Sequence, residues 1–157
     1  MKIETGQVAP DFTLFDTEKK PVALSDLRGK NVLLLFFPQA FTSVCTKEFC
    51  GVRDDIGRYS NVNAEVIGIS VDSVFTLKKY KEDQQYNFPF LSDFNKEVSA
   101  LYGSLIDEWI LGMKGVSKRS AFIIDKGGIV NYAEVLESTA DMPDFEAINE
   151  KLAALNG

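Results

Sequence analysis

Hydrophobic residues along the chain form continuous runs and periodic stretches that predict alternating strands and helices. Two apolar runs, residues 31–38 (NVLLLFFP) and 64–72 (AEVIGISVD), predict central strands that are buried on both faces. Apolar residues three and four positions apart predict a helix that begins near Ser43. The buried stripe of this helix is Phe49, Val52, Ile56 and Tyr59.

Shorter elements surround these strands. Alternating apolar residues predict a hairpin in residues 11–27, with its turn near residues 18–20, and a second hairpin in residues 118–135, with its turn at residues 126–128. Between them we expect a helix over residues 74–80, an extended segment over residues 88–93 and a second helix over residues 96–102.

The last segment predicts an amphipathic helix, with Pro143 as its starting residue. Its apolar positions are Phe145, Ile148, Leu152 and Leu155. No repeat, low-complexity tract or linker interrupts the 157 residues, so we expect a single domain, 1–157. The order of elements favours an α/β sandwich with a mixed sheet.

Composition and charge indicate a globular domain that does not bind nucleic acid or membranes. Apolar residues make up 45% of the chain and charged residues 25%, which is ordinary for a globular domain. The net charge of -6 disfavours nucleic acid and anionic membranes, which would repel the chain. No apolar run approaches the ~20 residues that cross a bilayer, and the start, MKIETGQVAP, lacks the apolar core of a signal peptide. We therefore expect a cytoplasmic protein without a membrane partner.

The chain contains two cysteines and no histidine. The missing histidine excludes Cys–His and Ser–His–Asp mechanisms and most zinc sites. Two cysteines supply too few ligands for a metal in this stretch, and we expect no metal and no other cofactor. In a reducing compartment, two neighbouring cysteines are expected to be reduced thiols with a chemical role.

Cys45 lies where a thiolate is favoured. A free cysteine has a pKa near ~8.5, so a reactive thiol needs a local cause that lowers it. With Thr42 or Ser43 as N-cap, Cys45 occupies the first helical turn, where unpaired N–H groups favour an anion. Cys45 also precedes Phe49 by four residues, so we expect its side chain to face the sheet.

Cys50 has neither advantage, because it lies more than a turn further along and off the buried stripe. In a regular helix, residues five apart have Cα atoms about 8.7 Å apart, whereas a disulfide requires less than ~7 Å. A bond between Cys45 and Cys50 would therefore require the first turns of the helix to unwind. The alternative for Cys50 is a small core residue without chemistry.

The segment PQAFTSVC, residues 38–45, matches the P-x-x-x-T-x-x-C signature of the peroxiredoxins, after a buried strand and at the start of a helix. CTKEFC further resembles the bacterioferritin comigratory protein (peroxiredoxin Q) group, and PQAFTSVC with Phe41 is similar to the alkyl hydroperoxide reductase E group. The resemblance implies a thioredoxin-like α/β fold, in which helices flank a mixed central sheet with an N-terminal β-hairpin extension. It also implies a thiol-dependent peroxidase.

The resemblance implies roles for five residues. Cys45 would be the peroxidatic thiolate, which attacks a peroxide and becomes a sulfenic acid. Thr42 would hydrogen-bond the thiolate and substrate, and Pro38 would shield the pocket from water. Arg119, in SKRSAF, would stabilise the thiolate and the departing oxygen, and Glu48 would orient Arg119. The alternatives are a surface charge at a strand edge for Arg119 and a solvated carboxylate for Glu48.

In the peroxiredoxin Q group, a cysteine at the position of Cys50 is the resolving thiol, and thioredoxin or a similar thiol then reduces the intramolecular disulfide. Phe49 lies beside it on the buried stripe, so unwinding would expose an aromatic ring at roughly 1.5 to 3 kcal/mol. The alternative is a one-cysteine cycle resolved by an external thiol.

Two further readings of the cysteines stay open. A thiol–disulfide oxidoreductase is disfavoured because the chain has no C-x-x-C. A non-enzymatic redox sensor shares the same thiolate.

The family contains monomers and homodimers. The family does not explain residues 109–113 (WILGM), for which an apolar wall for organic hydroperoxides, a dimer face and ordinary core are the options, core being favoured.

Overall fold

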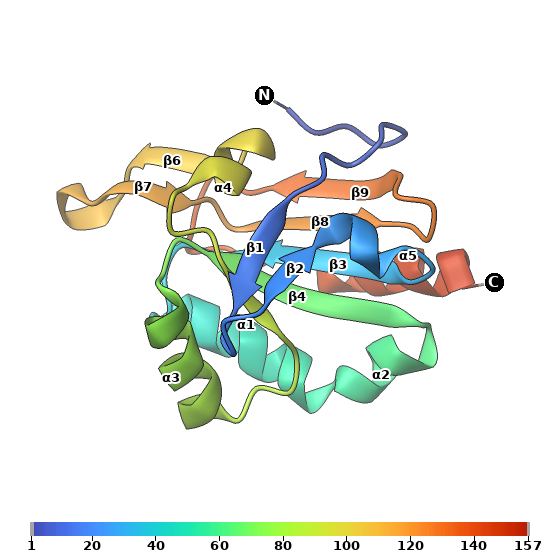
Figure 1. The fold of residues 1–157 in the computed structure, drawn as a ribbon, viewed down its shortest axis with the longest axis horizontal. Coiled ribbons are helices and arrows are strands. Elements are labelled where there is room, and N and C mark those ends of the chain that lie inside the picture. Colours follow the sequence, from blue (N-terminus) through green and yellow to red (C-terminus); the bar gives the residue numbers. More distant parts are fainter. Residues whose placement is uncertain (1, 157) are drawn as a thin grey trace.

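The central sheet of the computed structural model, which describes residues 2–156, has the strand order β2-β1-β5-β4-β3-β8-β9 (Figure 1). Pairs β3–β4 and β4–β5 are parallel, and the other pairs are antiparallel, so the predicted mixed sheet is confirmed. The strands are β1 (Thr13–Asp16), β2 (Pro21–Ala23), β3 (Asn31–Phe36), β4 (Ala64–Ser70), β5 (Phe90–Ser92), β8 (Ser120–Ile124) and β9 (Val130–Val135).

The two apolar runs form the centre of this sheet, as predicted. Strand β3 pairs with β4 from Asn31↔Ala64 to Phe36↔Ile69 and with β8 on its other edge. Every residue of β3 is buried, because elements cover both faces of the sheet. The helix that carries both cysteines begins after the carboxyl end of this strand.

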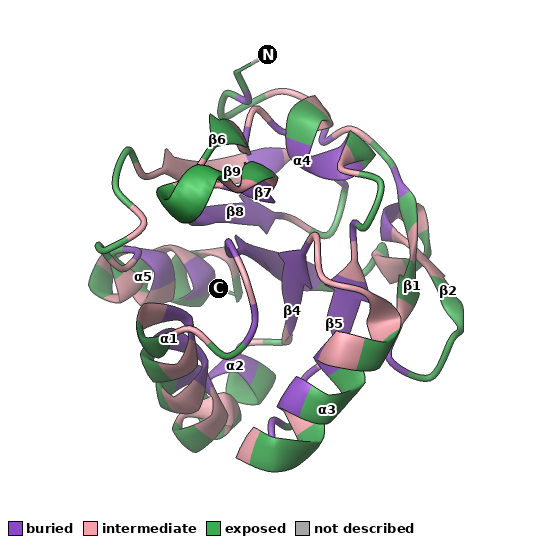
Figure 2. Ribbon diagram, turned by 90° about the vertical axis from the view of Figure 1, so that its left-hand side faces the viewer, coloured by how far each residue is buried: buried purple, intermediate pink, exposed green. Residues whose placement is uncertain are grey.

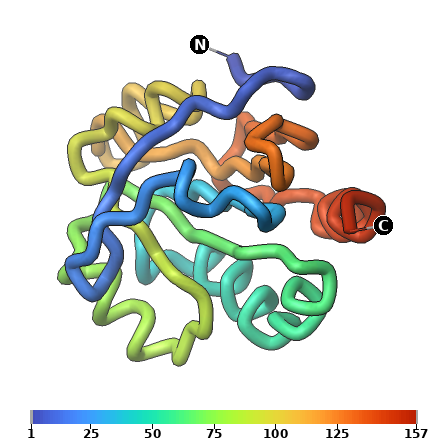
Figure 3. The backbone as a smooth tube through the Cα atoms, turned by 45° about the vertical axis from the view of Figure 1, so that its right-hand side comes forward, coloured from blue at the N-terminus to red at the C-terminus, as the bar shows by residue number. Residues whose placement is uncertain are grey.

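The predicted N-terminal hairpin is present as β1 and β2. It continues the central sheet, because β1 pairs with β5 at Phe15↔Ser92. The second predicted hairpin is β8–β9. The N-terminal segment passes over its turn, with an isolated bridge between Val8 and Ile129 (Figure 3).

Helices cover the sheet unequally. One face packs against α1 (Ser43–Asp54), α2 (Ile56–Asn61), α3 (Val74–Gln84) and α5 (Phe145–Asn156). The other face packs against the N-terminal segment, the 3-10 helix η1 (Leu24–Leu27) and α4 (Glu97–Leu101). Figure 2 shows the buried central strands between these layers. The cysteine helix thus lies on the more heavily covered face.

The prediction of one helix through Tyr59 was wrong at a single point. The helix breaks at Asp55, whose backbone angles (φ -115°, ψ 18°) separate α1 from α2. Aspartate and the nearby Gly57 are weak helix formers, which favours a break at this position. Tyr59 still packs into the same core after the break.

Pro143 does not start the last helix, so that prediction was wrong as well. Helix α5 begins at Phe145, and the carboxylate of Asp144 accepts a hydrogen bond from the N–H of Ala147 at 3.1 Å. This contact is of the N-cap type, so the polar side chain rather than the proline defines the helix start.

Residues 105–117 form a second sheet that the sequence did not predict. It consists of β6 (Leu105–Glu108) and β7 (Lys114–Ser117), joined by the 3-10 turn η2 (Ile110–Gly112). At the turn, Ile110 is 58% and Leu111 is 93% exposed, so these residues do not belong to the core. Figure 2 shows the turn between β6 and β7 as an exposed segment. Residues 109–113 are the tip of a projecting hairpin, and their assignment to the core was wrong.

Candidate active site

The loop between β3 and α1 is attached to the neighbouring strand β4. The N–H of Phe37 donates to the carbonyl oxygen of Ile69 at 3.0 Å. The N–H of Ala40 donates to the carboxylate of Asp72 at 2.8 Å, and the hydroxyl of Ser70 donates to the same carboxylate oxygen at 2.6 Å. Pro38 is buried within this loop. Asp72 therefore fixes the loop that leads to the cysteine helix.

Thr42 occupies the predicted N-cap position, with extended backbone angles (φ -88°, ψ 152°). Its carbonyl oxygen accepts the hydrogen bond from the N–H of Thr46 at 3.0 Å. Its side chain makes no capping hydrogen bond, because its hydroxyl donates to the carbonyl oxygen of Gln39 at 2.8 Å. The N–H groups of the first helical turn thus stay available to an anion.

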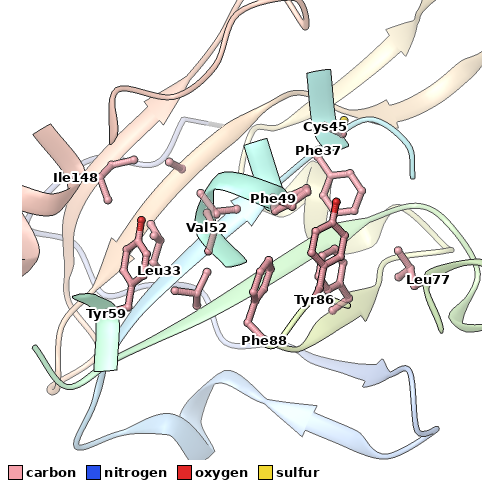
Figure 4. Close-up of a cluster of buried hydrophobic side chains, with 14 of the residues drawn as sticks. Leu33, Phe37, Cys45, Phe49, Val52, Tyr59, Leu77, Tyr86, Phe88 and Ile148 are labelled. Atoms are coloured by element: carbon pink, nitrogen blue, oxygen red, sulfur yellow. The ribbon is translucent and has the colours of Figure 1, made fainter. Parts of the chain in front are cut away.

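Cys45 lies in the first turn of α1 with no exposed surface. Its side chain faces the sheet, as its spacing from Phe49 predicted, and belongs to the same core cluster (Figure 4). Any reactant must therefore enter a largely closed site to reach the sulfur.

Arg119 is the positive charge beside this sulfur. It immediately precedes β8 and is 1% exposed. Its Nη2 group donates to Cys45 Sγ at 3.2 Å, and its Nη1 group donates to Glu48 Oε1 at 2.7 Å. Glu48 is 1% exposed, so it is not a solvated surface carboxylate. The structure thus brings a thiol, a guanidinium and a carboxylate from two elements into one buried cluster.

Opposing influences act on the Cys45 thiol. Burial raises the pKa of Cys45, and it is the largest influence. The charge of Arg119 lowers this pKa, as do the nearby Thr42 side chain, the hydrogen bond from Arg119 and the backbone of Gln39. The start of α1 acts in the same direction as Arg119. Arg119 is therefore the main side chain that offsets the cost of a buried thiolate.

Glu48 competes with the thiolate for the same cation. Burial raises the pKa of Glu48 to about 7, although Arg119 lowers it and the charge of Glu134 raises it further. Its second carboxylate oxygen, Oε2, has no hydrogen-bond partner among the described residues. Because one guanidinium faces two acidic groups, the charge on Glu48 influences how strongly Arg119 favours the thiolate.

Cys50 lies further along α1 and contacts the end of α3. Its sulfur is 3.6 Å from Gln84 Oε1 and 3.7 Å from the hydroxyl of Tyr86. Both cysteines are free thiols, and α1 runs through both of them. The regular helix between them agrees with the predicted need for unwinding.

Phe49, next to Cys50, is fully buried. Figure 4 shows it pointing from α1 into the aromatic cluster between the helices and the sheet. Its ring centroid lies 4.6 Å from that of Phe37 and 5.2 Å from that of Phe90. This packing holds the segment between the cysteines in helical form.

Two site residues, Asp72 and Thr139, were not identified from the sequence. Asp72 follows the buried strand β4, and an aspartate at the carboxyl end of a central strand is the signal that could have found it. Thr139 lies in the loop after β9, and its carbonyl oxygen accepts hydrogen bonds from Arg119 Nε at 3.2 Å and Nη2 at 2.9 Å. No sequence signal marks Thr139, because the contact uses its backbone.

Neither a membrane-spanning helix nor a metal-binding cluster lies within residues 2–156. Within that range no helix has the length and apolar character needed to cross a bilayer. The same residues contain no group of three or more histidine, cysteine, aspartate or glutamate side chains suited to a metal ion.

A buried cysteine at a helix start, beside an arginine and after a central strand of a mixed sheet, is the arrangement expected of a thiol-dependent enzyme of thioredoxin-like fold. The AhpC/TSA family model matches residues 5–133. The chain belongs to the AhpC/TSA family and is a peroxiredoxin like the bacterioferritin comigratory protein and peroxiredoxin Q group, that is, a thiol-dependent peroxidase.

Individual relatives support this assignment. The chain is 43% identical over 135 residues to the putative peroxiredoxin bcp of Coxiella burnetii, covering 83% of this chain and 87% of that protein. It is 36% identical over 156 residues to alkyl hydroperoxide reductase E of Mycobacterium tuberculosis, covering 98% of each. The crystal structure of peroxidoxin BcpB from Mycobacterium tuberculosis superposes with a TM-score of 0.86 at 33% identity, covering 98% of both chains. The predicted family and fold are thus confirmed.

Proposed function

We propose that Cys45 is the peroxidatic residue of this peroxiredoxin and that it reduces hydrogen peroxide or organic hydroperoxides. The observation that carries the proposal is the 3.2 Å contact between Arg119 Nη2 and Cys45 Sγ inside a buried cluster. A cation at this distance stabilises a thiolate, and the thiolate is the form of cysteine that attacks peroxides.

In the first step, the Cys45 thiolate attacks the terminal oxygen of the peroxide. A sulfur–oxygen bond forms, the oxygen–oxygen bond breaks, and Cys45 becomes a sulfenic acid. The electron pair of the broken bond leaves on the second oxygen, which takes a proton and departs as water or an alcohol. Arg119 faces the developing negative charge, so it stabilises the transition state as well as the thiolate.

The neighbouring residues prepare this step. Thr42 lies at the helix start and lowers the pKa of Cys45, and its hydroxyl turns from the carbonyl oxygen of Gln39 to bind the thiolate and the peroxide. Glu48 orients Arg119 through the 2.7 Å contact between Oε1 and Nη1. Pro38, buried in the preceding loop, excludes water from the thiol. Together these residues keep a desolvated anion in a fixed position.

Cys50 then resolves the sulfenic acid as an intramolecular disulfide. Its thiolate attacks Cys45 Sγ, a sulfur–sulfur bond forms, and the sulfenic oxygen leaves as hydroxide and is protonated to water. This step requires unwinding of α1 and exposure of Phe49, at roughly 1.5 to 3 kcal/mol. A dithiol reductant of the thioredoxin type supplies the two electrons that restore both thiols. A reducing compartment such as the cytoplasm suits this cycle.

One observation favours a second candidate, the one-cysteine cycle. Cys50 contacts Gln84 and Tyr86, and Phe49 beside it is fully buried, so the folded helix keeps Cys50 turned toward α3. If unwinding is slow, an external thiol reaches the Cys45 sulfenic acid first.

Peroxide consumption by Cys45→Ser and Cys50→Ser tests the proposal. Each variant is assayed with a thioredoxin system and, separately, with a small-thiol reductant. We expect Cys45→Ser to lose activity with both reductants, and Cys50→Ser to lose only the thioredoxin-coupled activity. Full activity of Cys45→Ser would refute the assignment of Cys45. Wild-type thioredoxin-coupled turnover of Cys50→Ser would favour the one-cysteine cycle.

A further inference from the structure

The guanidinium of Arg119 has a third partner besides Cys45 and Glu48. Nε and Nη2 both donate to the carbonyl oxygen of Thr139, at 3.2 and 2.9 Å. These contacts, with those to Cys45 and Glu48, use four of the five N–H donors of Arg119. The direction in which Nη2 meets the sulfur therefore depends on where the Thr139 carbonyl lies.

Thr139 lies in an irregular loop between β9 and α5. The loop leaves the site at Leu136, whose N–H donates to the Arg119 carbonyl oxygen at 3.0 Å, and returns to the Arg119 side chain at Thr139. Irregular loops rely on side-chain contacts for their position, because no ladder of backbone hydrogen bonds holds them.

Trp109 provides such a contact from another part of the chain. Its indole N–H donates to the hydroxyl oxygen of Thr139 at 3.0 Å. Trp109 is half-buried at the tip of the β6–β7 hairpin, where its backbone N–H donates to the carbonyl oxygen of Met113 at 2.6 Å. The backbone of Trp109 is thus fixed within the hairpin.

The base of the same hairpin is fixed beside Arg119. The N–H of Lys118 donates to the carbonyl oxygen of Ser104 at 2.6 Å, and the hydroxyls of Ser104 and Ser120 are 2.9 Å apart and buried. The hairpin is therefore linked to Arg119 at both ends. At its base, it contacts Lys118 and Ser120, which flank Arg119 in the chain. At its tip, Trp109 contacts Thr139, which in turn contacts Arg119. This arrangement makes the hairpin a rigid support for the guanidinium.

We infer that Trp109 and the side chain of Thr139 are positioning residues for Arg119. The inference rests on the proposed role of Arg119 at Cys45. The indole N–H holds Thr139 so that its carbonyl oxygen accepts from Arg119 and directs Nη2 to the sulfur. Neither residue touches the peroxide. This assigns a function to the hairpin tip, for which the family signature gave none.

The test is a double-mutant cycle on the single-turnover rate constant of Cys45 with hydrogen peroxide, measured by loss of free thiol. Trp109→Phe removes the indole N–H donor and keeps an aromatic ring. Thr139→Val removes the hydroxyl acceptor and keeps a side chain of similar shape. We expect each to lower the rate constant about 3- to 10-fold, the worth of one neutral hydrogen bond. The double variant should lose no more than either single one, because both remove the same link.

Two variants separate positioning from general damage to the fold. Thr139→Ser keeps the hydroxyl and should retain the wild-type rate within about 2-fold. Leu111→Ala alters the exposed end of the same hairpin and should leave the rate unchanged. In Thr139→Val, the pH at which the rate is half-maximal should rise, because Arg119 then favours the thiolate less.

Arg119→Gln, measured in parallel, distinguishes the two possible failures. The positioning role is wrong if Arg119→Gln lowers the rate constant but Thr139→Val and Trp109→Phe have the same rate constant as Leu111→Ala. The positioning role is also wrong if the fold-losses in rate constant of the two single variants multiply in the double variant, because the two side chains would then act independently. If Arg119→Gln keeps the wild-type rate, the proposed role of Arg119 fails, whereas the assignment of Cys45 fails only if Cys45→Ser keeps its activity.

Discussion

Arg119 donates through Nη2 to Cys45 Sγ at 3.2 Å and through Nη1 to Glu48 at 2.7 Å. The two acidic groups come from neighbouring turns of α1, and the cation comes from the residue that precedes β8. Because all three side chains are buried, the interaction between their charges is little screened by solvent. In the proposed mechanism, Arg119 is therefore the charged group on which the reactivity of the thiol depends most.

Replacing Arg119 by glutamine should remove most of the peroxidase activity. Loss of the cation leaves a buried thiolate without compensation, and we expect the rate constant with hydrogen peroxide to fall about 100-fold or more. The half-maximal pH should rise, because Arg119 lowers the pKa of Cys45. Stopped-flow kinetics from pH 5 to 10 would measure both effects.

Lys118→Gln is the matched control for this prediction, since it removes the neighbouring positive charge. We expect wild-type kinetics for this variant. A larger loss in Lys118→Gln than in Arg119→Gln would mean that the charge had been assigned to the wrong residue.

Glu48 should make the stability of the protein depend on pH. Its pKa rises from 4.5 to about 7 in the folded chain, so the folded state holds this proton more tightly than the unfolded state. This contribution is complete below the unfolded pKa and is lost as the pH rises from about 4.5 through about 7. The shift corresponds to roughly 3 kcal/mol of unfolding free energy.

Urea unfolding at closely spaced pH values, with the thiols kept reduced, would measure this slope. Glu48→Gln has no carboxyl group to titrate, so its unfolding free energy should fall less over the same interval. The exposed Glu137→Gln should keep the wild-type slope. Identical slopes in wild type and Glu48→Gln would contradict the assigned cause.

Phe49→Leu should speed the formation of the Cys45–Cys50 disulfide. The smaller side chain loses contacts with Phe37 and Phe90, so the helical segment between the cysteines is less firmly held. A loss of roughly 1 kcal/mol would raise the rate of disulfide formation about 5-fold. Quenched-flow mass spectrometry after one equivalent of peroxide would follow the bond.

Phe88→Leu provides the comparison, because Phe88 packs in the same cluster but lies outside α1. It should lower the overall stability without a matching gain in disulfide rate. Equal acceleration in both variants would indicate that general loosening, rather than unwinding of α1, limits resolution.

Asp72→Ala should weaken both the fold and the site. The carboxylate accepts from the N–H of Ala40 and the hydroxyl of Ser70, and removing it leaves these buried donors unpaired. We expect a loss of about 1 to 3 kcal/mol in unfolding free energy and a slower reaction with peroxide. Asp72→Asn keeps one acceptor oxygen and should lie between wild type and Asp72→Ala in both assays.

The central part of the fold could be predicted from the sequence because it depends on local patterns. The apolar runs at residues 31–38 and 64–72 became β3 and β4, and the spacing of Cys45 and Phe49 correctly placed both side chains against the sheet. The buried cluster around Arg119 could be anticipated only through the family signature, since residues 45 and 119 are far apart in the sequence.

Other features depended on contacts that periodicity does not encode. The apolar residues Ile110 and Leu111 suggested core, yet the turn at the hairpin tip exposes them. Leu111 and Gly112 adopt positive φ angles there, which a pattern of hydrophobic positions does not indicate. Thr139 contacts Arg119 through a backbone carbonyl, so its residue type does not indicate this contact.

The central claim is that Cys45 reacts first with peroxide and that Cys50 resolves it. Peptide mass mapping after one equivalent of hydrogen peroxide tests this most directly, with wild type and Cys50→Ser compared. We predict a Cys45–Cys50 disulfide in wild type and a single added oxygen on Cys45 in Cys50→Ser. Oxidation of Cys50 with Cys45 left as a free thiol would contradict the account.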